Sequence, residues 1–131
     1  MGQQQLLLII LGVIVVGIAV AVGITMFSDN AVSANKDAVT NDLVNLASRA
    51  QQYYRRPTAL GGGQGTFTGL LTDITKLTAK PTNANGTYTI TSNGDDQIVL
   101  HGEGTELGNN NAKISIDMLV LADSTAVTFN N

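Results

Sequence analysis

The chain is distinctive first for what it lacks. Its 131 residues include no cysteine, no tryptophan and only two prolines, and 13% of them are charged. Without cysteine the chain can form no disulfide, no thiolate metal site and no cysteine nucleophile. The net charge of −3 argues against a nucleic-acid-binding protein, which normally presents a basic patch. The length suits one domain with a modest core.

Charge is also missing from one whole end of the chain. No Asp, Glu, Lys or Arg precedes Asp29, and residues 6–24 are apolar except for Gly12, Gly17 and Gly23. As a helix, these 19 residues span roughly 28 Å, which matches the hydrocarbon thickness of a bilayer. The run has no polar face of the kind that a soluble amphipathic helix shows. We therefore predict a membrane-inserted helix.

The flanks of this run lack the features of a cleaved secretory signal. No basic residue precedes it, and no small residues follow at 25–27, so we expect the segment to be retained. Without a flanking Lys or Arg cluster, the orientation in the membrane stays open. Gly17 and Ala21 form a small-xxx-small pair, and Gly12 and Gly23 extend the small surface, as in closely packed helices. The alternative is that glycine is simply common in transmembrane helices.

An amphipathic segment follows the apolar run. Between residues 28 and 57, apolar residues recur at spacings of seven, four, three, four and three, which predicts a helical stripe that packs on the head: Val32, Val39, Leu43, Leu46, Ala50 and Tyr53. Pro57 ends this helix. A continuous helix over residues 4–56 would be roughly 80 Å long, so its first half must protrude. Residues 28–30 could cap a new helix, which leaves a kink there open.

The rest of the chain predicts a small head. Residues 58–65 read as a flexible Gly-rich linker, and the spacing of Phe67, Leu70, Leu71, Ile74 and Leu77 predicts one short helix. From residue 87 the apolar period becomes two, which predicts an antiparallel meander of four strands with a loop at 102–111. The predicted fold class is α+β, with an apolar helix (1–28), its amphipathic continuation (29–56), a Gly-rich loop with a short helix (57–86) and a β-meander head (87–131).

Residues that could carry chemistry are few. His101 stands alone, so it can build neither a triad nor a zinc site, and we expect an ordinary strand residue. The acidic residues of two predicted loops could hold calcium weakly, although solvated loops are the favoured interpretation: Asp95, Asp96, Glu103 and Glu106. Asn85 begins an Asn-x-Thr glycosylation pattern. We predict no catalytic residues, no metal and no cofactor, and hence no enzyme.

The plan of the whole chain resembles a type IV pilin. An uncharged apolar helix runs into an amphipathic helix, and a Gly-rich loop and a small antiparallel sheet follow. The most family-like stretches are residues 2–8, GQQQLLL, and residues 45–57, which include ASRAQQYY. The resemblance implies a structural subunit that polymerises into an extracellular filament, with apolar helices in the centre and heads outside.

The resemblance also implies partners and a location. The partners are other copies of the chain, the lipid bilayer before assembly, a prepilin peptidase and inner-membrane assembly machinery. The location is a cell-surface filament, with a pool anchored in the cytoplasmic membrane. The candidate filament-core residues are apolar or small: Leu6, Leu7, Leu8, Ile9, Ile10, Leu11, Gly12, Val13, Val16, Gly17, Val20, Ala21 and Ile24. In the filament we expect the helix to loosen around Gly12 and Gly17, since glycine lowers helix propensity.

The chain departs from the pilin pattern at its N-terminus. Pilins usually carry a basic leader ending in Gly, and a Glu fifth in the mature chain. Cleavage after Gly2 would make Gln3 first and Leu7 fifth, whereas a mature chain beginning at Met1 has Gln5 fifth. The Glu is missing in both cases, and glutamine amides can offer only uncharged, weaker hydrogen bonds. The chain also lacks the cysteine pair that closes a C-terminal loop in many pilins.

Other functions stay open at this stage. One is a single-pass, membrane-anchored binding module that never polymerises, and another is a minor pseudopilin of a secretion system. A filamentous-phage coat protein fits less well, because such coats are short and nearly all helical. For a filament, the task could be adhesion, motility, DNA uptake or secretion.

Overall fold

One long helix and one sheet make up the molecule. A computed structural model describes residues 2–70 and 73–131, with the side chains of residues 92 and 93 outside the description. In chain order the elements are α1 (Gly2–Arg55), the 3-10 helices η1 (Thr58–Leu60), η2 (Thr68–Leu70) and η3 (Ile74–Lys76), and the strands β1 (Gly86–Asn93), β2 (Gln97–Leu107), β3 (Lys113–Leu121) and β4 (Thr125–Phe129). The predicted α+β class is confirmed, since α1 packs on a four-stranded antiparallel sheet.

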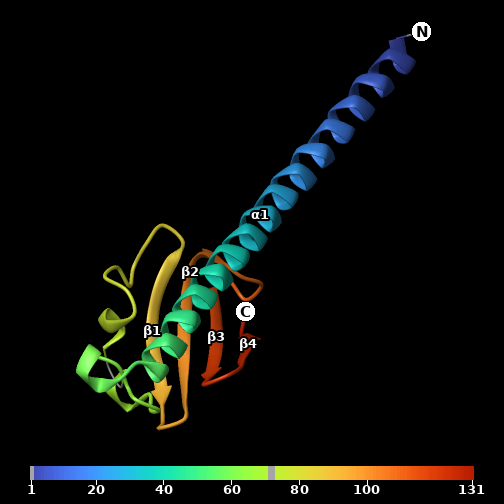
Figure 1. Ribbon diagram of the computed structural model, residues 1–131. Coiled ribbons are helices and arrows are strands. Elements are labelled where there is room, and N and C mark those ends of the chain that lie inside the picture. Colours follow the sequence, from blue (N-terminus) through green and yellow to red (C-terminus); the bar gives the residue numbers. More distant parts are fainter. Residues whose placement is uncertain (1, 71–72) are drawn as a thin grey trace.

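The helix α1 is continuous over 54 residues, or roughly 80 Å at the standard rise. It does not break at residues 28–30, where the sequence left a kink open, and no glycine or proline occurs between residues 24 and 56 to force one. Its C-terminal half passes in front of the sheet and its N-terminal half projects from the rest (Figure 1). We call residues 31–131 the head.

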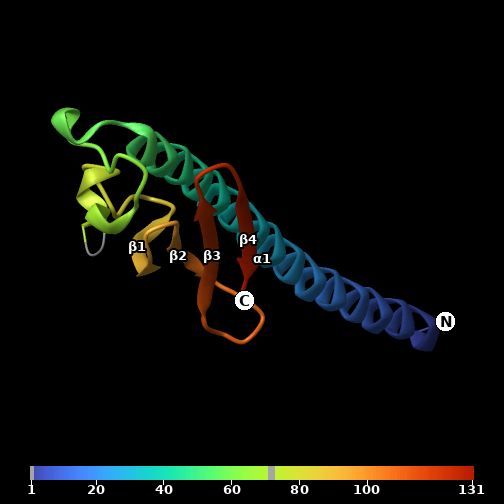
Figure 2. The same ribbon diagram turned by 60° about the horizontal axis from the view of Figure 1, so that its bottom comes forward.

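The sheet is a simple meander in the order β1-β2-β3-β4. All three pairings are antiparallel, and the four strands lie side by side next to α1 (Figure 2). Along β2 and β3 every second side chain is buried, which is the period-two pattern of a sheet with one face covered. The covering element is α1, which contacts both of these central strands.

The core forms where the helical stripe meets the covered face of the sheet. In α1, the side chains of Val39, Leu43, Leu46 and Ala50 are buried, and those of Val32 and Tyr53 pack against them partly buried. The buried sheet residues are Tyr88, Ile98, Leu100, Ile114, Ile116, Met118 and Val120. Burying one such aliphatic side chain contributes roughly 1.5–3 kcal/mol, so this interface is the main source of the head's stability.

The predicted loop at 102–111 is wrong over most of its length. The strand β2 continues to Leu107, and its residues Gly102 and Glu103 pair with Ile116 and Ser115 of β3. The connection to β3 is confined to residues 108–112. Consequently Glu103 and Glu106, expected in a loop, lie on a strand.

The glycines that suggested a loop are needed for the contact between helix and sheet. A Cβ atom added at Gly102 would lie 2.8 Å from Val39 Cγ1, and one added at Gly104 would lie 2.3 Å from Asn35 Oδ1. Glycine in a strand interior often marks such a close approach. From the sequence alone, a glycine of this kind cannot be distinguished from a glycine in a loop.

The Gly-rich segment is also not the flexible linker that its composition predicted. The N–H of Gly63 donates to Tyr53 O at 2.8 Å, and the N–H of Gly65 donates to Tyr54 O at 2.7 Å. These bonds satisfy carbonyls that the end of a helix leaves without partners. A Cβ atom at Gly62 would lie 2.1 Å from the carbonyl oxygen of Arg56, so glycine is required there. The segment is a cap on α1.

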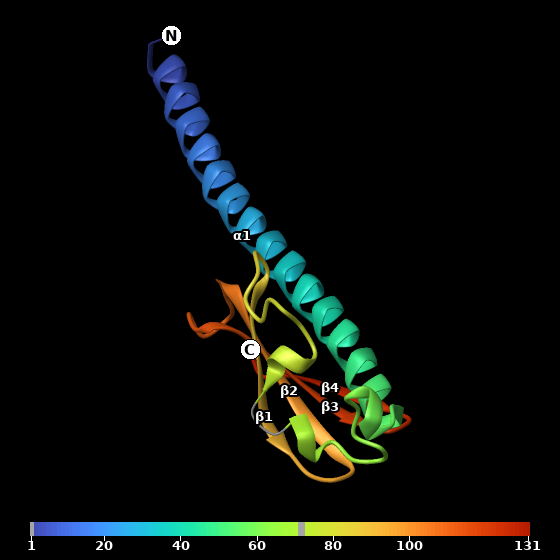
Figure 3. The ribbon, with the colours of Figure 1, turned by 60° about the vertical axis from the view of Figure 1, so that its left-hand side comes forward.

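The described residues between 67 and 77 contain two 3-10 helices, η2 and η3, where one short helix was predicted. Of the residues in that prediction, Phe67, Leu70 and Leu77 are buried, and Leu71 lies outside the described residues. A 3-10 helix returns to the same side every three residues, so the apolar spacing fits either helix type. Between α1 and β1, the described residues begin at the C-terminal end of α1 and lie beside the sheet up to the start of β1 (Figure 3).

Candidate functional site

The N-terminal half of α1 carries a large apolar surface without a protein partner in this chain. Every large apolar side chain from residue 6 to residue 27 is exposed, with fractions between 51% and 78%. All the candidate filament-core residues lie on this exposed stretch. Soluble monomers rarely expose so large a contiguous apolar surface. By length and composition this part of α1 could cross a membrane and anchor the chain there.

Small residues interrupt this surface on two sides of the helix. At about 100° per residue, Gly12 and Gly23 point to a side roughly 150° away from Gly17 and Ala21. The sequence interpretation treated them as one extended small surface, whereas helical geometry separates them into two. A Cβ atom at Gly12, Gly17 or Gly23 would meet nothing within 4 Å. These glycines therefore have no packing role within the single chain.

The N-terminus itself is part of this exposed surface. Gly2 and Gln3 lie in the first turn of α1 and are exposed, while Met1 lies outside the described residues. The first turn of α1 contains no acidic residue to complement the positive end of the helix dipole. The glutamines 3–5 are exposed and can hydrogen-bond outward.

Two polar side chains of α1 each make three hydrogen bonds to the rest of the head, and sequence analysis missed both. Asn35 is only 9% exposed, although it is not among the residues of the predicted apolar stripe. Its Nδ2 donates to Asn85 O at 2.8 Å, and its Oδ1 accepts from the N–H groups of Thr105 at 3.0 Å and Glu106 at 3.2 Å. One amide thus joins α1 to the start of β1 and to the end of β2. The available signal was spacing, since Asn35 lies three residues after Val32 and four before Val39, at the position that the helical period leaves empty in the predicted stripe.

Asp42 forms the second anchor. Its Oδ2 accepts hydrogen bonds from Tyr88 Oη at 2.5 Å and from the Nδ2 atoms of Asn83 and Asn85, each at 2.9 Å. Burial raises the pKa of Asp42, but the bonds from Asn85, Tyr88 and Asn83 outweigh burial and hold this pKa below its ordinary value. Burial, together with Asp42, raises the pKa of the Tyr88 hydroxyl.

Asn85, the predicted glycosylation residue, belongs to both anchors. Its backbone oxygen accepts from Asn35 and its Nδ2 donates to Asp42. That nitrogen is the atom to which an N-linked glycan would attach. Glycosylation of Asn85 stays a prediction, and a glycan there would have to share the nitrogen with this hydrogen bond.

The outer face of the sheet brings His101 beside Asp117. The two residues are direct neighbours across β2 and β3, and His101 Nδ1 lies 2.5 Å from Asp117 Oδ1. Asn130 Nδ2 donates to the other carboxylate oxygen at 2.8 Å. Burial raises the pKa of Asp117, but the hydrogen bonds from His101 and Asn130 lower it by more, so the pKa lies below its ordinary value. The arrangement is a cross-strand polar pair on an open surface.

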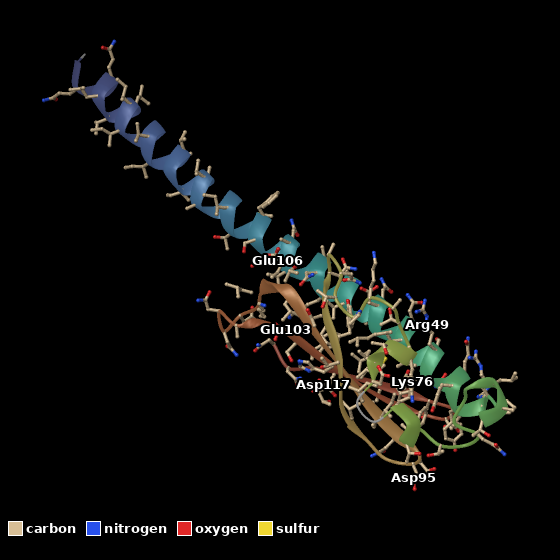
Figure 4. All side chains as sticks on the ribbon, turned by 90° about the vertical axis from the view of Figure 1, so that its left-hand side faces the viewer. Arg49, Lys76, Asp95, Glu103, Glu106 and Asp117 are labelled. Carbon is tan, nitrogen blue, oxygen red and sulfur yellow. The ribbon has the colours of Figure 1, made fainter. Side chains whose placement is uncertain are left out.

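A metal site needs several ligating side chains close together. Within residues 2–70 and 73–131, no three His, Cys, Asp or Glu side chains gather closely enough to hold a metal ion. The calcium interpretation of Asp95, Asp96, Glu103 and Glu106 meets the same difficulty. Glu103 instead pairs with Lys113, whose Nζ lies 3.1 Å from Glu103 Oε1, and Figure 4 shows Asp95 far from Glu103 and Glu106.

The surface that stands out is thus the apolar half of α1, which continues without a break into the half that packs on the sheet through an apolar interface and the Asn35 and Asp42 anchors. No protein family, curated protein or solved structure matches the chain.

Proposed function

We propose that this chain is a structural subunit of a type IV pilus-like filament at the cell surface. Subunits pack through the apolar halves of their α1 helices, which form the filament core, and the heads coat the outside. Before assembly, the same apolar half holds each subunit in the membrane. The resemblance of the sequence to type IV pilins suggested this function, and the features of α1 and the head support it.

The observation that carries the proposal is the exposure of every large apolar side chain between residues 6 and 27. Such a surface needs either lipid or other protein copies around it. A simple membrane anchor needs only about 20 apolar residues and no particular geometry beyond them. In this chain the anchor continues as one helix into the head, with no flexible joint, so the direction of the apolar half is set by the head.

The small residues of α1 support a filament rather than a closed dimer. A two-fold dimer uses one surface on each copy, whereas an open helical assembly uses two different surfaces on each copy. Gly17 and Ala21 lie on one side of α1, and Gly12 and Gly23 lie on the nearly opposite side. Small residues let helix backbones approach closely in an apolar environment. Each subunit therefore has two faces on which neighbouring helices can pack.

The experiment is to shear surface material from cells that produce the chain and to examine it by electron microscopy and mass spectrometry. Filaments composed mainly of this chain support the proposal. Filaments that contain the chain only in trace amounts would identify a minor pseudopilin. A chain that stays entirely in the membrane fraction, with no filament, would identify a membrane-anchored module that never polymerises. Intact mass of the purified chain tests cleavage after Gly2 in the same preparation.

A further inference from the structure

A polar groove runs along the head at the end remote from the apolar half of α1. One side is formed by Asp42, Asn45, Arg49 and Gln52, which recur every three or four residues along one edge of α1, and by Arg56 directly after the helix. From residue 42 to residue 56 the groove is roughly 21 Å long at the helical rise. The segment between α1 and β1 forms the opposite side.

The groove consists of two adjoining hollows that share Arg49. The first, of about 280 Å³, is lined by Asn45, Thr78, Lys80 and Asn83 among others. The second, of about 440 Å³, is lined by residues that include Tyr53, Arg56 and Lys76. Its length and polarity suit an extended, hydrophilic ligand rather than a compact apolar one.

Positive charge gathers in this groove although the chain is acidic overall. Four of the seven basic residues line it: Arg49, Arg56, Lys76 and Lys80. In the part of the chain that the structure describes, no carboxylate forms an ion pair with any of them. Figure 4 shows Arg49 and Lys76 toward one end of the head and Glu103 and Glu106 toward the other. The hydrogen bond from Thr75 and, to a smaller extent, the charge of Lys76 lower the pKa of Asp73, so this carboxylate lies near Lys76 without forming an ion pair with it. The other three cations have no such neighbour among the described ion pairs, and the group can bind an external anion.

Two of these cations are held in place by the fold. Arg49 Nη1 donates to Leu77 O at 2.8 Å, and Lys76 Nζ donates to Gly69 O. The guanidinium of Arg49 keeps its remaining N–H groups available, because one fork carries five donors. Fixed cations bind an anionic group with less loss of side-chain freedom than mobile surface lysines do.

The first hollow also presents a carboxylate, which narrows the ligand class. All three donors that bind Asp42 reach its Oδ2, and none of the described residues donates to Oδ1. The low pKa of Asp42 keeps that oxygen an acceptor only. A phosphate chain would be repelled by it, whereas a sugar hydroxyl can donate to it. Asn45 adds an amide without a hydrogen-bond partner among the described residues, and Asn83 keeps one N–H of its amide beside the bond to Asp42. The Thr78 hydroxyl is already bonded to the backbone of Lys80.

We propose that this groove binds an acidic oligosaccharide, with sugar hydroxyls at Asp42, Asn45 and Asn83 and the acidic groups at Arg49, Arg56, Lys76 and Lys80. The acidic groups can be carboxylates, as in a uronic acid, or sulfates, because both accept from the same cations. This site does not depend on filament formation, since all its residues lie in the head of one chain.

The test measures binding to the full chain in neutral detergent micelles by calorimetry. The probes are a short oligogalacturonate, a heparin oligosaccharide of similar length, a neutral maltooligosaccharide, inorganic phosphate and a short DNA duplex. We expect one or both acidic oligosaccharides to bind more tightly than the neutral one and than phosphate, and the two arms show whether the carboxylate or the sulfate is preferred. Equal binding of phosphate, tighter binding of DNA, or no binding of either acidic oligosaccharide overturns the proposal.

Variants locate the site. Arg56→Gln with Lys80→Gln removes two exposed charges whose side chains make no hydrogen bond in the described structure, and we expect roughly tenfold or greater loss of affinity. The matched control, Lys36→Gln with Lys113→Gln, removes two charges elsewhere and should leave affinity unchanged. Equal affinities for the two double variants would overturn the assignment.

A third variant tests the sugar contacts rather than the charge. Asn45 is exposed and its side chain has no hydrogen-bond partner among the described residues, so Asn45→Ala should leave the head folded. We expect this variant to bind the acidic oligosaccharide more weakly and to bind inorganic phosphate as weakly as the parent chain does. Unaltered oligosaccharide binding by Asn45→Ala would show that the groove recognises only the acidic groups and not the sugar hydroxyls, which would contradict the proposal.

Discussion

Replacement of Gly17 by leucine should disturb the packing between subunits without disturbing the folding of one subunit. A Cβ atom at Gly17 meets nothing within 4 Å in the single chain, so a larger side chain is accommodated there without strain. The substitution also favours the helix, because leucine exceeds glycine in helix propensity by up to about 1 kcal/mol. Membrane insertion is retained, since leucine is more apolar than glycine. Any loss of assembly must therefore arise where another chain approaches this face.

The size of the expected effect follows from the proposed close approach of helices. Inserting a bulky side chain into a packed contact costs about 1–3 kcal/mol. Since 1.4 kcal/mol is tenfold in an equilibrium constant, the affinity of a subunit for the filament should fall roughly 5- to 150-fold. A polymer repeats the same contact at every subunit, so this loss appears as a sharp drop in filament yield.

The assay compares Gly17→Leu with Val15→Leu, which adds one methylene to a position that already carries a large exposed side chain. Filament mass in the sheared fraction is measured against total chain in the membrane fraction. We expect few or no filaments from Gly17→Leu, normal filaments from Val15→Leu, and equal thermal stability of the two heads. Normal filament yield from Gly17→Leu would refute the close packing of helices at this face.

Three further predictions concern the anchors and the helix. Asn35→Ala should lower the unfolding free energy of the head by roughly 1–3 kcal/mol in thermal or denaturant melts, because the buried amide of Asn35 and its hydrogen bonds to Asn85, Thr105 and Glu106 are lost, while Ser33→Ala at an exposed position changes little. The pKa of Asp42 is lower in the folded than in the unfolded chain, so its carboxylate stabilises the head above about pH 4, and this contribution is lost as the pH falls through the folded pKa. Asp42→Asn should therefore be less stable than the parent at neutral pH, with the gap closing in acid, and parallel pH profiles would contradict this origin. In a filament map we expect broken helical hydrogen bonds between Gly12 and Gly17, and an unbroken helix there would contradict the predicted loosening.

Features that depend on local sequence were predictable. The apolar run at residues 6–24 and the period-two strands report local burial patterns, and the α+β class follows from them. The stripe from Val39 to Ala50 could be recognised for the same reason, since helical spacing places these residues on one face. Such patterns need no knowledge of which distant segment covers them.

Features that depend on distant partners could not be predicted. Asn35 resembles a solvent-facing residue until its partners, 50 to 71 positions away in the chain, are brought beside it. Gly104 looks like loop composition because the helix side chain that requires a glycine there is equally remote. The polar groove joins residues of α1 to the segment before β1, so its cations become neighbours only in the folded head.

In the proposed filament, the apolar half of α1 packs against the apolar halves of neighbouring subunits. A cryo-electron microscopy reconstruction of the sheared surface material tests this claim most directly. The account predicts a helical filament of this chain, with residues 6–24 buried among neighbouring α1 helices near the axis and the heads on the outside. A filament held by contacts between heads, with the apolar halves of α1 outside its core, would contradict it.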